Sequence, residues 1–150
     1  MKVLAENKKA YFNYEILEKF EAGISLIGQE VKSIKLGHIN LAGSYVIIDK
    51  NSEVFWIGAK VPPYQPNNAP ADYSPERSRK LLLKKKEINY LIGKSRQRGL
   101  TLIPLKVYTK NAKIKLEFGI GKGKKEIDKR EIIKKRETDK DIERELKARG

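Results

Sequence analysis

The chain has 150 residues, a mass of 17.2 kDa and a formal net charge of +14, from 33 lysines and arginines against 19 acidic residues. It has no cysteine and one histidine, His38, which excludes disulfides, thiol nucleophiles and cysteine- or histidine-rich metal sites. No apolar stretch is long enough for a secretory signal or a membrane span. We therefore expect one cytoplasmic domain without metal or cofactor. Its basic charge suits a nucleic acid better than the alternative, an anionic membrane surface.

Two elements are expected in the first 40 residues. Apolar and aromatic residues alternate with polar ones over residues 11–20, which predicts a half-buried strand. Apolar residues at helical spacing over 27–34 predict a short helix that ends before Gly37. Glu30 falls at the edge of the apolar face of this helix.

The middle of the chain predicts a hairpin followed by a loop. Residues 44–49 and 53–59 are rich in β-branched and aromatic residues, and the polar segment 49–52 between them is typical of a turn. Residues 61–75 hold five of the six prolines, so an exposed loop is expected there. Four aromatic residues could pack in the core or stack on bases, and the core is favoured: Tyr11, Tyr45, Phe55 and Trp56.

Residues 77–98 are the strongest electrostatic feature, with nine basic residues and one acid, Glu87. Such a run is often only a solvated face, but it creates a strong positive potential. Because it lies inside the fold and lacks bulky interfacial aromatics, RNA is a better partner for it than a membrane. Its apolar residues share a helical face, so a helix is expected here: Leu81, Ile88, Leu91 and Ile92.

Two more strands complete the predicted fold. Residues 101–107 and 114–120 alternate between apolar and polar types, with a turn at 109–112. Pro104 indicates an edge or a bulge in the first of them. Five strands with short connections and one or two helices predict a mainly β fold with flanking helices. Its form is a closed antiparallel barrel of the oligonucleotide-binding (OB) type over residues 1–120.

The composition changes in the tail, residues 121–150. This segment has 12 basic and 8 acidic residues, so it carries +4 of the net charge and leaves +10 on the body. It has too few apolar residues to form a core of its own. We expect a basic tail that is disordered when free and becomes helical on a binding partner.

No motif predicts catalysis. Residues 119–125 resemble a phosphate-binding loop but lack the serine or threonine after Lys124 and the last glycine of the dinucleotide motif. They are expected to form a flexible basic hinge that contacts RNA phosphate, with a plain linker as the alternative. Four carboxylates could suggest acid–base chemistry, but their spacing does not favour a catalytic pair: Glu15, Glu18, Glu21 and Glu30. An acid at the rim of an RNA site could instead accept hydrogen bonds from bases or ribose.

Seven short segments carry a more specific signal: residues 7–10, 20–24, 28–34, 79–83, 86–88, 99–108 and 123–130. In this order, and over nearly the whole chain, they resemble the SmpB family, whose members bind tmRNA, also called SsrA RNA. The resemblance implies an OB-like barrel with flanking helices and a C-terminal tail. It also implies a non-enzymatic RNA-binding role in trans-translation.

In this family the body binds the tRNA-like domain of tmRNA. Together with elongation factor Tu it delivers alanyl-tmRNA to stalled ribosomes for rescue and peptide tagging. The resemblance implies that the tail enters the empty mRNA channel, near the decoding centre of the small-subunit rRNA, and is helical there. A monomer is expected. The alternative is a general basic OB-type protein that associates with ribosomes or acts as an RNA chaperone.

The resemblance also implies site residues. In the tmRNA-facing patch, Glu21 would accept hydrogen bonds, Leu82 would pack on nucleotides and Lys113 would contact phosphate. The implied neighbours in that patch are Asn7, Lys8, Glu30, Arg79 and Lys80. The residues implied for the ribosomal step are Gly123, Lys124, Lys125, Asp128, Lys129 and Arg130. The residue before Asp128 is often aromatic or histidine in the family, whereas this chain has Ile127, which can pack but not stack in the same way.

Overall fold

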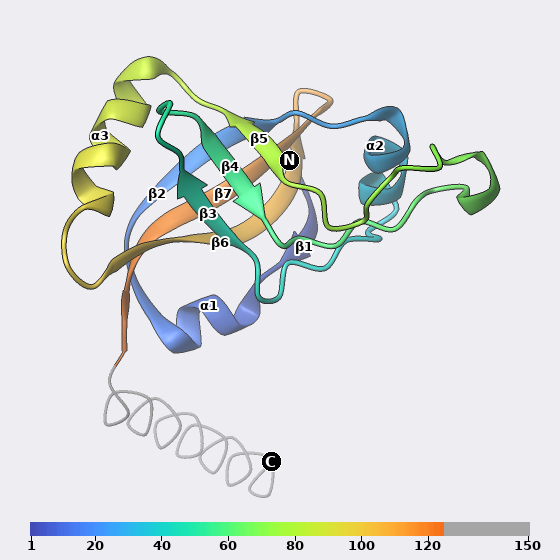
Figure 1. Cartoon of the computed structure of the whole chain (residues 1–150). Coiled ribbons are helices and arrows are strands. Elements are labelled where there is room, and N and C mark those ends of the chain that lie inside the picture. Colours follow the sequence, from blue (N-terminus) through green and yellow to red (C-terminus); the bar gives the residue numbers. More distant parts are fainter. Residues whose placement is uncertain (125–150) are drawn as a thin grey trace, which may run out of the picture.

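The computed structural model describes residues 1–124, which form seven strands, three α-helices and one 3-10 turn (Figure 1). The strands are β1 (Lys2–Glu6), β2 (Tyr14–Ile24), β3 (Tyr45–Ile48), β4 (Val54–Ile57), β5 (Arg79–Leu82), β6 (Leu100–Lys110) and β7 (Lys113–Gly123). The helices are α1 (Lys8–Asn13), α2 (Gly28–Lys35) and α3 (Lys85–Ser95), and the 3-10 turn is η1 (Pro66–Asn68). Within this part of the chain, no helix has the length and apolar character needed to cross a membrane.

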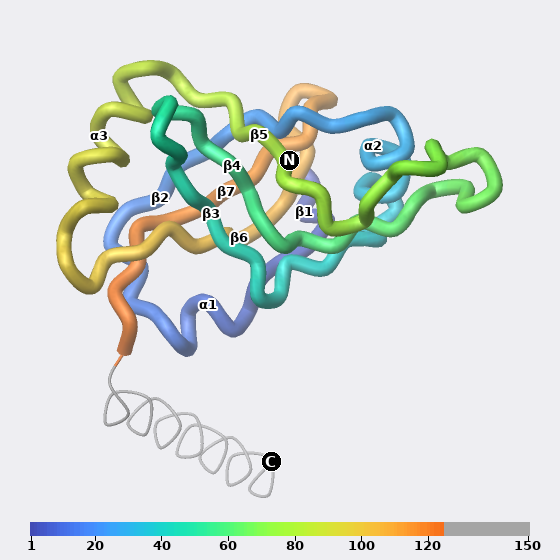
Figure 2. The backbone as a smooth tube through the Cα atoms, viewed as in Figure 1, coloured from blue at the N-terminus to red at the C-terminus, as the bar shows by residue number. Residues whose placement is uncertain are grey.

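The strands form a closed antiparallel barrel. The hydrogen-bonded order runs β6-β3-β4-β5-β2-β7, and β7 pairs again with β6, which closes the ring. β1 pairs with residues 106–109 of β6, while β3 pairs with the same strand at Leu102. The tube view shows β2, β6 and β7 curving around one interior (Figure 2). The predicted mainly β fold, a closed antiparallel barrel with flanking helices, is confirmed.

The core fills the barrel with large apolar side chains. Trp56 and Phe118 have no exposed surface, and Leu81 and Leu91 pack in the same cluster. The Trp56 indole N–H donates to the Ser44 hydroxyl at 3.0 Å, so its one polar atom is satisfied inside the barrel. The favoured placement in the core is therefore correct for Trp56, but it is wrong for Tyr11 and Tyr45, which are exposed.

Near the N-terminus, one predicted boundary was wrong and one strand was not predicted. Residues 8–13 form helix α1, and the strand begins only at Tyr14. Ala10 on this helix is buried against Ile103 and Leu105, so a tertiary contact outweighs the alternating pattern. The strand β1 was not predicted, because its five residues carry little periodic signal on their own.

The helix expected over residues 77–98 is in fact a strand followed by a helix. In β5, Arg79 and Leu81 are buried while Lys80 and Leu82 are exposed, which is the period of a strand. The helical part starts at Lys85, where the Glu87 carboxylate accepts a hydrogen bond from the Lys84 N–H at 3.2 Å.

The glycine-rich segment 119–125 was expected to be a hinge, but its first five residues belong to β7. They pair with β2 on one side and with β6 on the other. A Cβ at Gly119 would lie 2.8 Å from Ile16 Cγ2, and one at Gly121 would lie 2.5 Å from Ile103 Cδ1. Glycine is required at Gly119, where the Glu18 carbonyl would also lie 2.9 Å from the added Cβ, whereas at Gly121 the end of the Ile103 side chain would have to move.

The two-residue turn between β6 and β7 stores backbone strain. Asn111 and Ala112 have φ of 52° and 63°, the left-handed region that both central residues of a type I′ turn occupy. Asparagine tolerates this region, whereas alanine costs roughly 1–2 kcal/mol there. We expect Ala112→Gly to raise the free energy of unfolding by about 0.5–1 kcal/mol, after allowing for the greater flexibility of glycine in the unfolded chain.

Urea unfolding measures this effect. Gly93→Ala is the matched control, since Gly93 lies exposed in α3 and a Cβ added there would meet no other atom within 4 Å. At this helical position the reverse substitution, glycine to alanine, should stabilise by about 0.5–1 kcal/mol. Destabilisation by Ala112→Gly would show that the turn is not strained.

Candidate nucleic-acid interface

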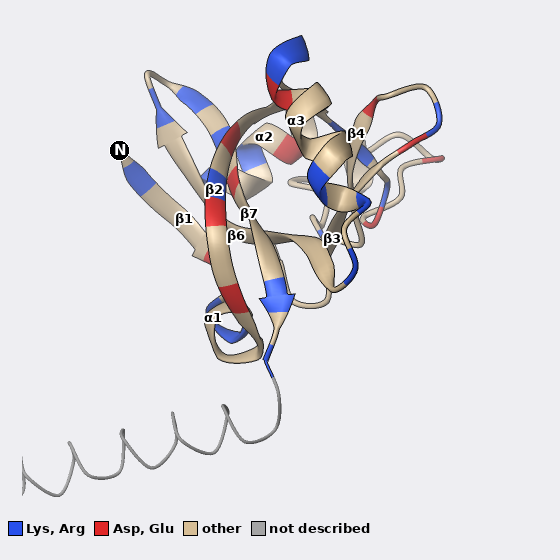
Figure 3. Ribbon diagram, turned by 90° about the vertical axis from the view of Figure 1, so that its left-hand side faces the viewer, with Lys and Arg blue, Asp and Glu red and all other residues tan. Residues whose placement is uncertain are grey.

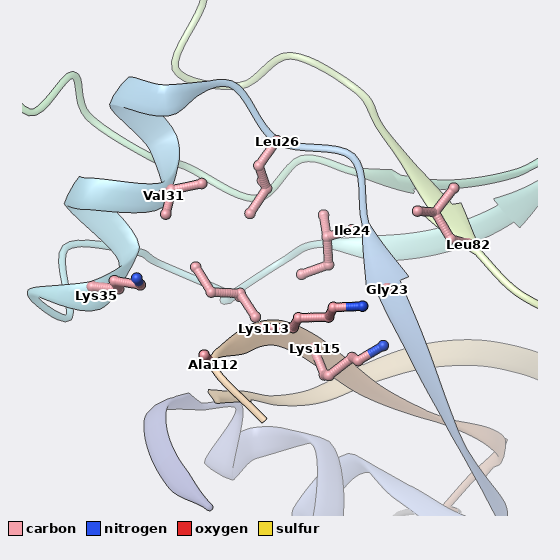
Figure 4. Close-up of a pocket in the computed structure, with 10 residues that line it drawn as sticks. Gly23, Ile24, Leu26, Val31, Lys35, Leu82, Ala112, Lys113 and Lys115 are labelled. Carbon is pink, nitrogen blue, oxygen red and sulfur yellow. The ribbon is translucent and has the colours of Figure 1, made fainter. Parts of the chain in front are cut away.

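A groove of about 450 Å³ lies between α2, the end of β2 and the β6–β7 turn (Figure 4). We call it the α2–β7 groove. Apolar side chains line it from the end of β2, from the segment after it and from α2: Ile24, Leu26 and Val31. Lysines line it from α2 and β7: Lys35, Lys113 and Lys115. An apolar lining beside ammonium groups can hold a base and a phosphate at the same time.

A second hollow, of about 520 Å³, adjoins this groove. The residues that line it come from β2, from β5 and the start of α3, and from β7: Glu21, Gly23, Leu82, Leu83, Lys84, Glu87 and Lys115. Gly23, Leu82 and Lys115 belong to both hollows. Three of the residues implied by the family resemblance, Glu21, Leu82 and Lys113, therefore surround one continuous surface.

Leu82 is exposed because β5 alternates. Its neighbour Leu81 is buried in the core, so Leu82 points outward and 55% of its surface is accessible. It lies against Gly23 of β2, where an added Cβ would come within 3.3 Å of Leu82 Cβ. A large apolar side chain held among lysines suits packing against a nucleotide.

Glu21 is held in place from β6. The Tyr108 hydroxyl donates to Glu21 Oε2, and Lys110 Nζ lies 3.5 Å from Oε1. The hydrogen bond from Tyr108 and the positive charges of Lys110 and Lys115 lower the pKa of Glu21, despite some burial. The carboxylate is therefore ionised at neutral pH, and it can accept hydrogen bonds from bases or ribose.

Glu30 and Arg79 are placed differently from the prediction. Neither side chain has any exposed surface, and Arg79 Nε donates to Glu30 Oε2 at 2.6 Å. Neither side chain is accessible to an RNA ligand in this structure. The prediction that Glu30 and Arg79 belong to the contact surface is therefore corrected. The cause is the alternation of β5, which turns Arg79 inward, and the position of Glu30 on the inner face of α2.

These two residues instead form the centre of a buried polar cluster. Arg77 donates to both carboxylate oxygens of Glu30. The Tyr73 hydroxyl donates to the Val61 carbonyl at 2.7 Å and lies 3.3 Å from Glu30 Oε2. Arg79 also donates to the carbonyls of Ala59 at 2.9 Å and Pro75 at 3.0 Å. The cluster joins α2 to the proline-rich loop and β5, and so it fixes one wall of the α2–β7 groove.

Glu30 is ionised although it is buried. Burial opposes ionisation, but the hydrogen bonds from Arg77, the Ile27 N–H and Arg79 outweigh it, so the pKa of Glu30 lies below its ordinary value. Two of the nine basic residues in the 77–98 run therefore form ion pairs with Glu30.

The other implied neighbours lie away from the groove or at its margin. The Asn7 side-chain amide donates to the Pro104 carbonyl at 3.0 Å, next to the bulge that Pro104 was predicted to mark. Lys8 is exposed on α1, at the end of the barrel opposite the β6–β7 turn (Figure 1). Lys80 is exposed on β5 and lies 3.9 Å from Glu53.

The first residues implied for the ribosomal step lie at the end of β7. Gly123 ends the strand. The Lys124 N–H donates to the Asn13 carbonyl at 2.9 Å, and Lys124 Nζ donates to the Tyr11 carbonyl at 2.8 Å. Lys124 thus caps the C-terminus of α1. Lys125, Asp128, Lys129 and Arg130, together with the tail expected to be helical on a partner, lie outside the described residues.

Sequence reasoning missed two residues of this surface, Lys115 and Lys35, and the buried Tyr108 that supports it. Lys115 follows Lys113 by two residues, so the alternation of β7 puts both on one face, and this signal could have been used. Tyr108 was hidden because it reaches Glu21 across β7, a contact that only the strand order reveals. Figure 3 shows the acidic positions of β2 among basic segments from several other elements. Within residues 1–124, no group of three or more metal-ligating side chains occurs.

A closed antiparallel barrel with a basic, partly apolar groove is typical of nucleic-acid-binding proteins of the OB type. The SmpB protein family model matches residues 4–148, which is nearly the whole chain. The chain therefore belongs to the SmpB family.

Individual relatives agree with this assignment. The SsrA-binding protein of Carboxydothermus hydrogenoformans is 50% identical over 99% of this chain and 98% of its own. The SsrA-binding protein of Magnetococcus marinus is 49% identical over 98% of this chain and 97% of its own. A similar solved structure, from work described as "tmRNA-SmpB: a journey to the center of the bacterial ribosome", has a TM-score of 0.67 and 41% identity. The match covers 81% of this chain and 85% of that one.

Proposed function

We propose that this protein is an RNA-binding factor of trans-translation. Its barrel binds the tRNA-like domain of tmRNA and carries it to ribosomes that have stalled, in the cytoplasm. Membership of the SmpB family supports this function, since the curated relatives are SsrA-binding proteins. The observation that carries the proposal is the surface around Glu21, Leu82 and Lys113, where an acceptor, an apolar contact and a cation converge.

Each group on this surface has a task in the proposed complex. Lys113 and Lys115 neutralise phosphates, and binding at such cations releases counterions from the RNA. Leu82 packs on a nucleotide, and Glu21 accepts hydrogen bonds from a base or a ribose hydroxyl. No covalent step is needed, so the protein acts as a binding factor rather than an enzyme.

The remaining parts of the proposal concern the ribosome. Residues 125–150 enter the empty mRNA channel near the decoding centre, and elongation factor Tu joins through alanyl-tmRNA. The ten basic residues of this segment outnumber its eight acidic residues, which supports contact with rRNA. Lys124, the last described residue, is bonded to α1, at the end of the barrel opposite the β6–β7 turn.

A gel-shift comparison tests the function. The protein should bind the isolated tRNA-like domain of tmRNA at least about tenfold more tightly than an ordinary tRNA at the same salt concentration. Equal affinity for the two RNAs would favour a general RNA-binding protein or RNA chaperone over the proposed role.

Lys113→Ala tests the groove itself. If Lys113 contacts a phosphate, its loss should weaken binding of the tRNA-like domain by about 1–3 kcal/mol. The slope of log affinity against log salt should fall by about 1. Lys50→Ala removes another exposed lysine, from the β3–β4 turn, and it should leave both quantities almost unchanged. If the two variants lose the same affinity, Lys113 makes no specific contact.

A further inference from the structure

The hydrogen bond between Tyr108 and Glu21 lies beside the groove and is partly buried. Tyr108 lies on β6, and only 2% of its surface is exposed. Its hydroxyl donates to Glu21 Oε2 on β2, although β7 lies between the two strands. A buried tyrosine thus has its single polar side-chain atom directed at the carboxylate that is proposed to face RNA.

We propose that Tyr108 is a positioning residue for RNA recognition, whose hydroxyl holds one oxygen of Glu21 and leaves the other for a base or ribose donor. This inference rests on the proposed function, because it assumes that Glu21 contacts the RNA. Oε1 is bonded only to the Lys110 ammonium, at the long distance of 3.5 Å, and the Glu21 side chain is 36% exposed. This oxygen therefore keeps a lone pair that can accept a further hydrogen bond.

The direction of the hydrogen bond is fixed by its surroundings. Burial and the neighbouring carboxylates of Glu21 and Glu117 raise the pKa of Tyr108, so its hydroxyl keeps its proton and donates. The same bond lowers the pKa of Glu21, so the carboxylate accepts. A free glutamate would sample several rotamers, and ordering it on binding would cost conformational entropy. Tyr108 removes that cost in advance.

The structure supplies a matched control on the same strand. Tyr90 of α3 donates its hydroxyl to Glu18 of β2, three residues before Glu21. This pair has the same two functional groups as the first one, but Glu18 lines neither the α2–β7 groove nor the adjoining hollow. Tyr90→Phe therefore removes the same kind of hydrogen bond without touching the proposed RNA contact.

The experiment compares the full chain with its Tyr108→Phe, Glu21→Gln and Tyr90→Phe variants and with the double variant at Tyr108 and Glu21. Affinity for the isolated tRNA-like domain is measured in one buffer, and urea unfolding checks that each variant is folded. Tyr108→Phe and Glu21→Gln should each weaken binding about tenfold. The double variant should lose little more, because both act through one contact. Tyr90→Phe should bind as the unmodified chain does.

A spectroscopic measurement gives a second readout that packing alone would not change. The pKa of Glu21, followed by NMR in the RNA-free protein, should rise in Tyr108→Phe. The groups that remain around Glu21 are Lys110 on β6, Lys115 and Glu117 on β7, and Lys84 and Glu87 at the start of α3. None of them replaces the lost donor. An unchanged Glu21 pKa would overturn the inference.

The affinities separate two kinds of failure. If Glu21→Gln binds normally, the placement of Glu21 in the RNA interface is wrong, and the role of Tyr108 is lost with it. If Glu21→Gln weakens binding but Tyr108→Phe does not, the interface stands and Tyr108 has no positioning role. Equal losses in Tyr90→Phe and Tyr108→Phe would also overturn the inference.

Discussion

A chain that ends at Lys124 should bind the tRNA-like domain of tmRNA with nearly the affinity of the full protein, yet it should not support peptide tagging on stalled ribosomes. The reason is the division of the molecule: all residues that line the groove lie within residues 1–124, whereas residues 125–150 are proposed to act on the ribosome. The boundary follows from the structure. β7 continues to Gly123, and Lys124 is hydrogen-bonded to α1, so an earlier cut would damage the barrel. A tagging assay with stalled ribosomes and a gel shift give the two readouts.

The truncated chain needs a control for loss of charge. The removed segment carries 10 basic and 8 acidic residues, because Lys122 and Lys124 stay with the barrel, so its net charge is only +2. The control replaces it with a segment of the same length made of glycine and serine, with two lysines that restore the net charge. This replacement should leave tagging absent. Tagging by either altered protein would contradict the division of labour between barrel and tail.

Glu30→Gln should destabilise the protein by about 3–5 kcal/mol, a large share of the stability of a small domain. The substitution keeps the size of the side chain but leaves the buried guanidinium of Arg79 without its counter-charge. It also weakens the bonds that join α2, the proline-rich loop and β5. Urea unfolding at pH 7 measures the loss. Glu76→Gln is the control: its ion pair with Lys60, at 3.5 Å, is more than half exposed on both sides, and its loss should cost less than about 1 kcal/mol.

The same cluster gives the stability a definite pH dependence. The pKa of Glu30 is lower in the folded protein than its ordinary value, so its contribution is fully present above the ordinary pKa of glutamate, near pH 4.3. It is lost as the pH falls through the lowered pKa of the folded state. The Glu30→Gln variant should therefore lose less stability than the unmodified chain between about pH 5 and pH 3. Parallel curves for the two proteins would show that Glu30 does not titrate in this way.

The barrel could be predicted because its longest strands carry clear alternation. Residues 114–120 and 103–107 have apolar residues at every second position, and the β3–β4 hairpin has a polar turn between two β-rich runs. The errors lie where tertiary contacts decide between helix and strand. Residues 8–13 and 79–82 are too short for a period to be read, and each takes its form from the neighbour on which it packs.

The site could be predicted only in part, because it is assembled from strands that are distant in sequence. The resemblance identified Leu82 and Lys113, which the fold brings to the same groove. It could not separate exposed residues from buried ones within one motif. Arg79 and Leu82 are three residues apart on a four-residue strand, and they point to opposite sides of the barrel wall. Only the alternation of β5 within the closed sheet makes that distinction.

One strand links the two ends of the molecule at which RNA is proposed to bind. β7 begins at Lys113, on the rim of the groove, and ends at Gly123, one residue before the bond to α1. Eleven residues of strand span at most about 36 Å, and pairing on both edges prevents the strand from sliding. β7 therefore fixes the separation between the groove proposed to bind the tRNA-like domain and Lys124, which precedes the segment proposed to act on the ribosome.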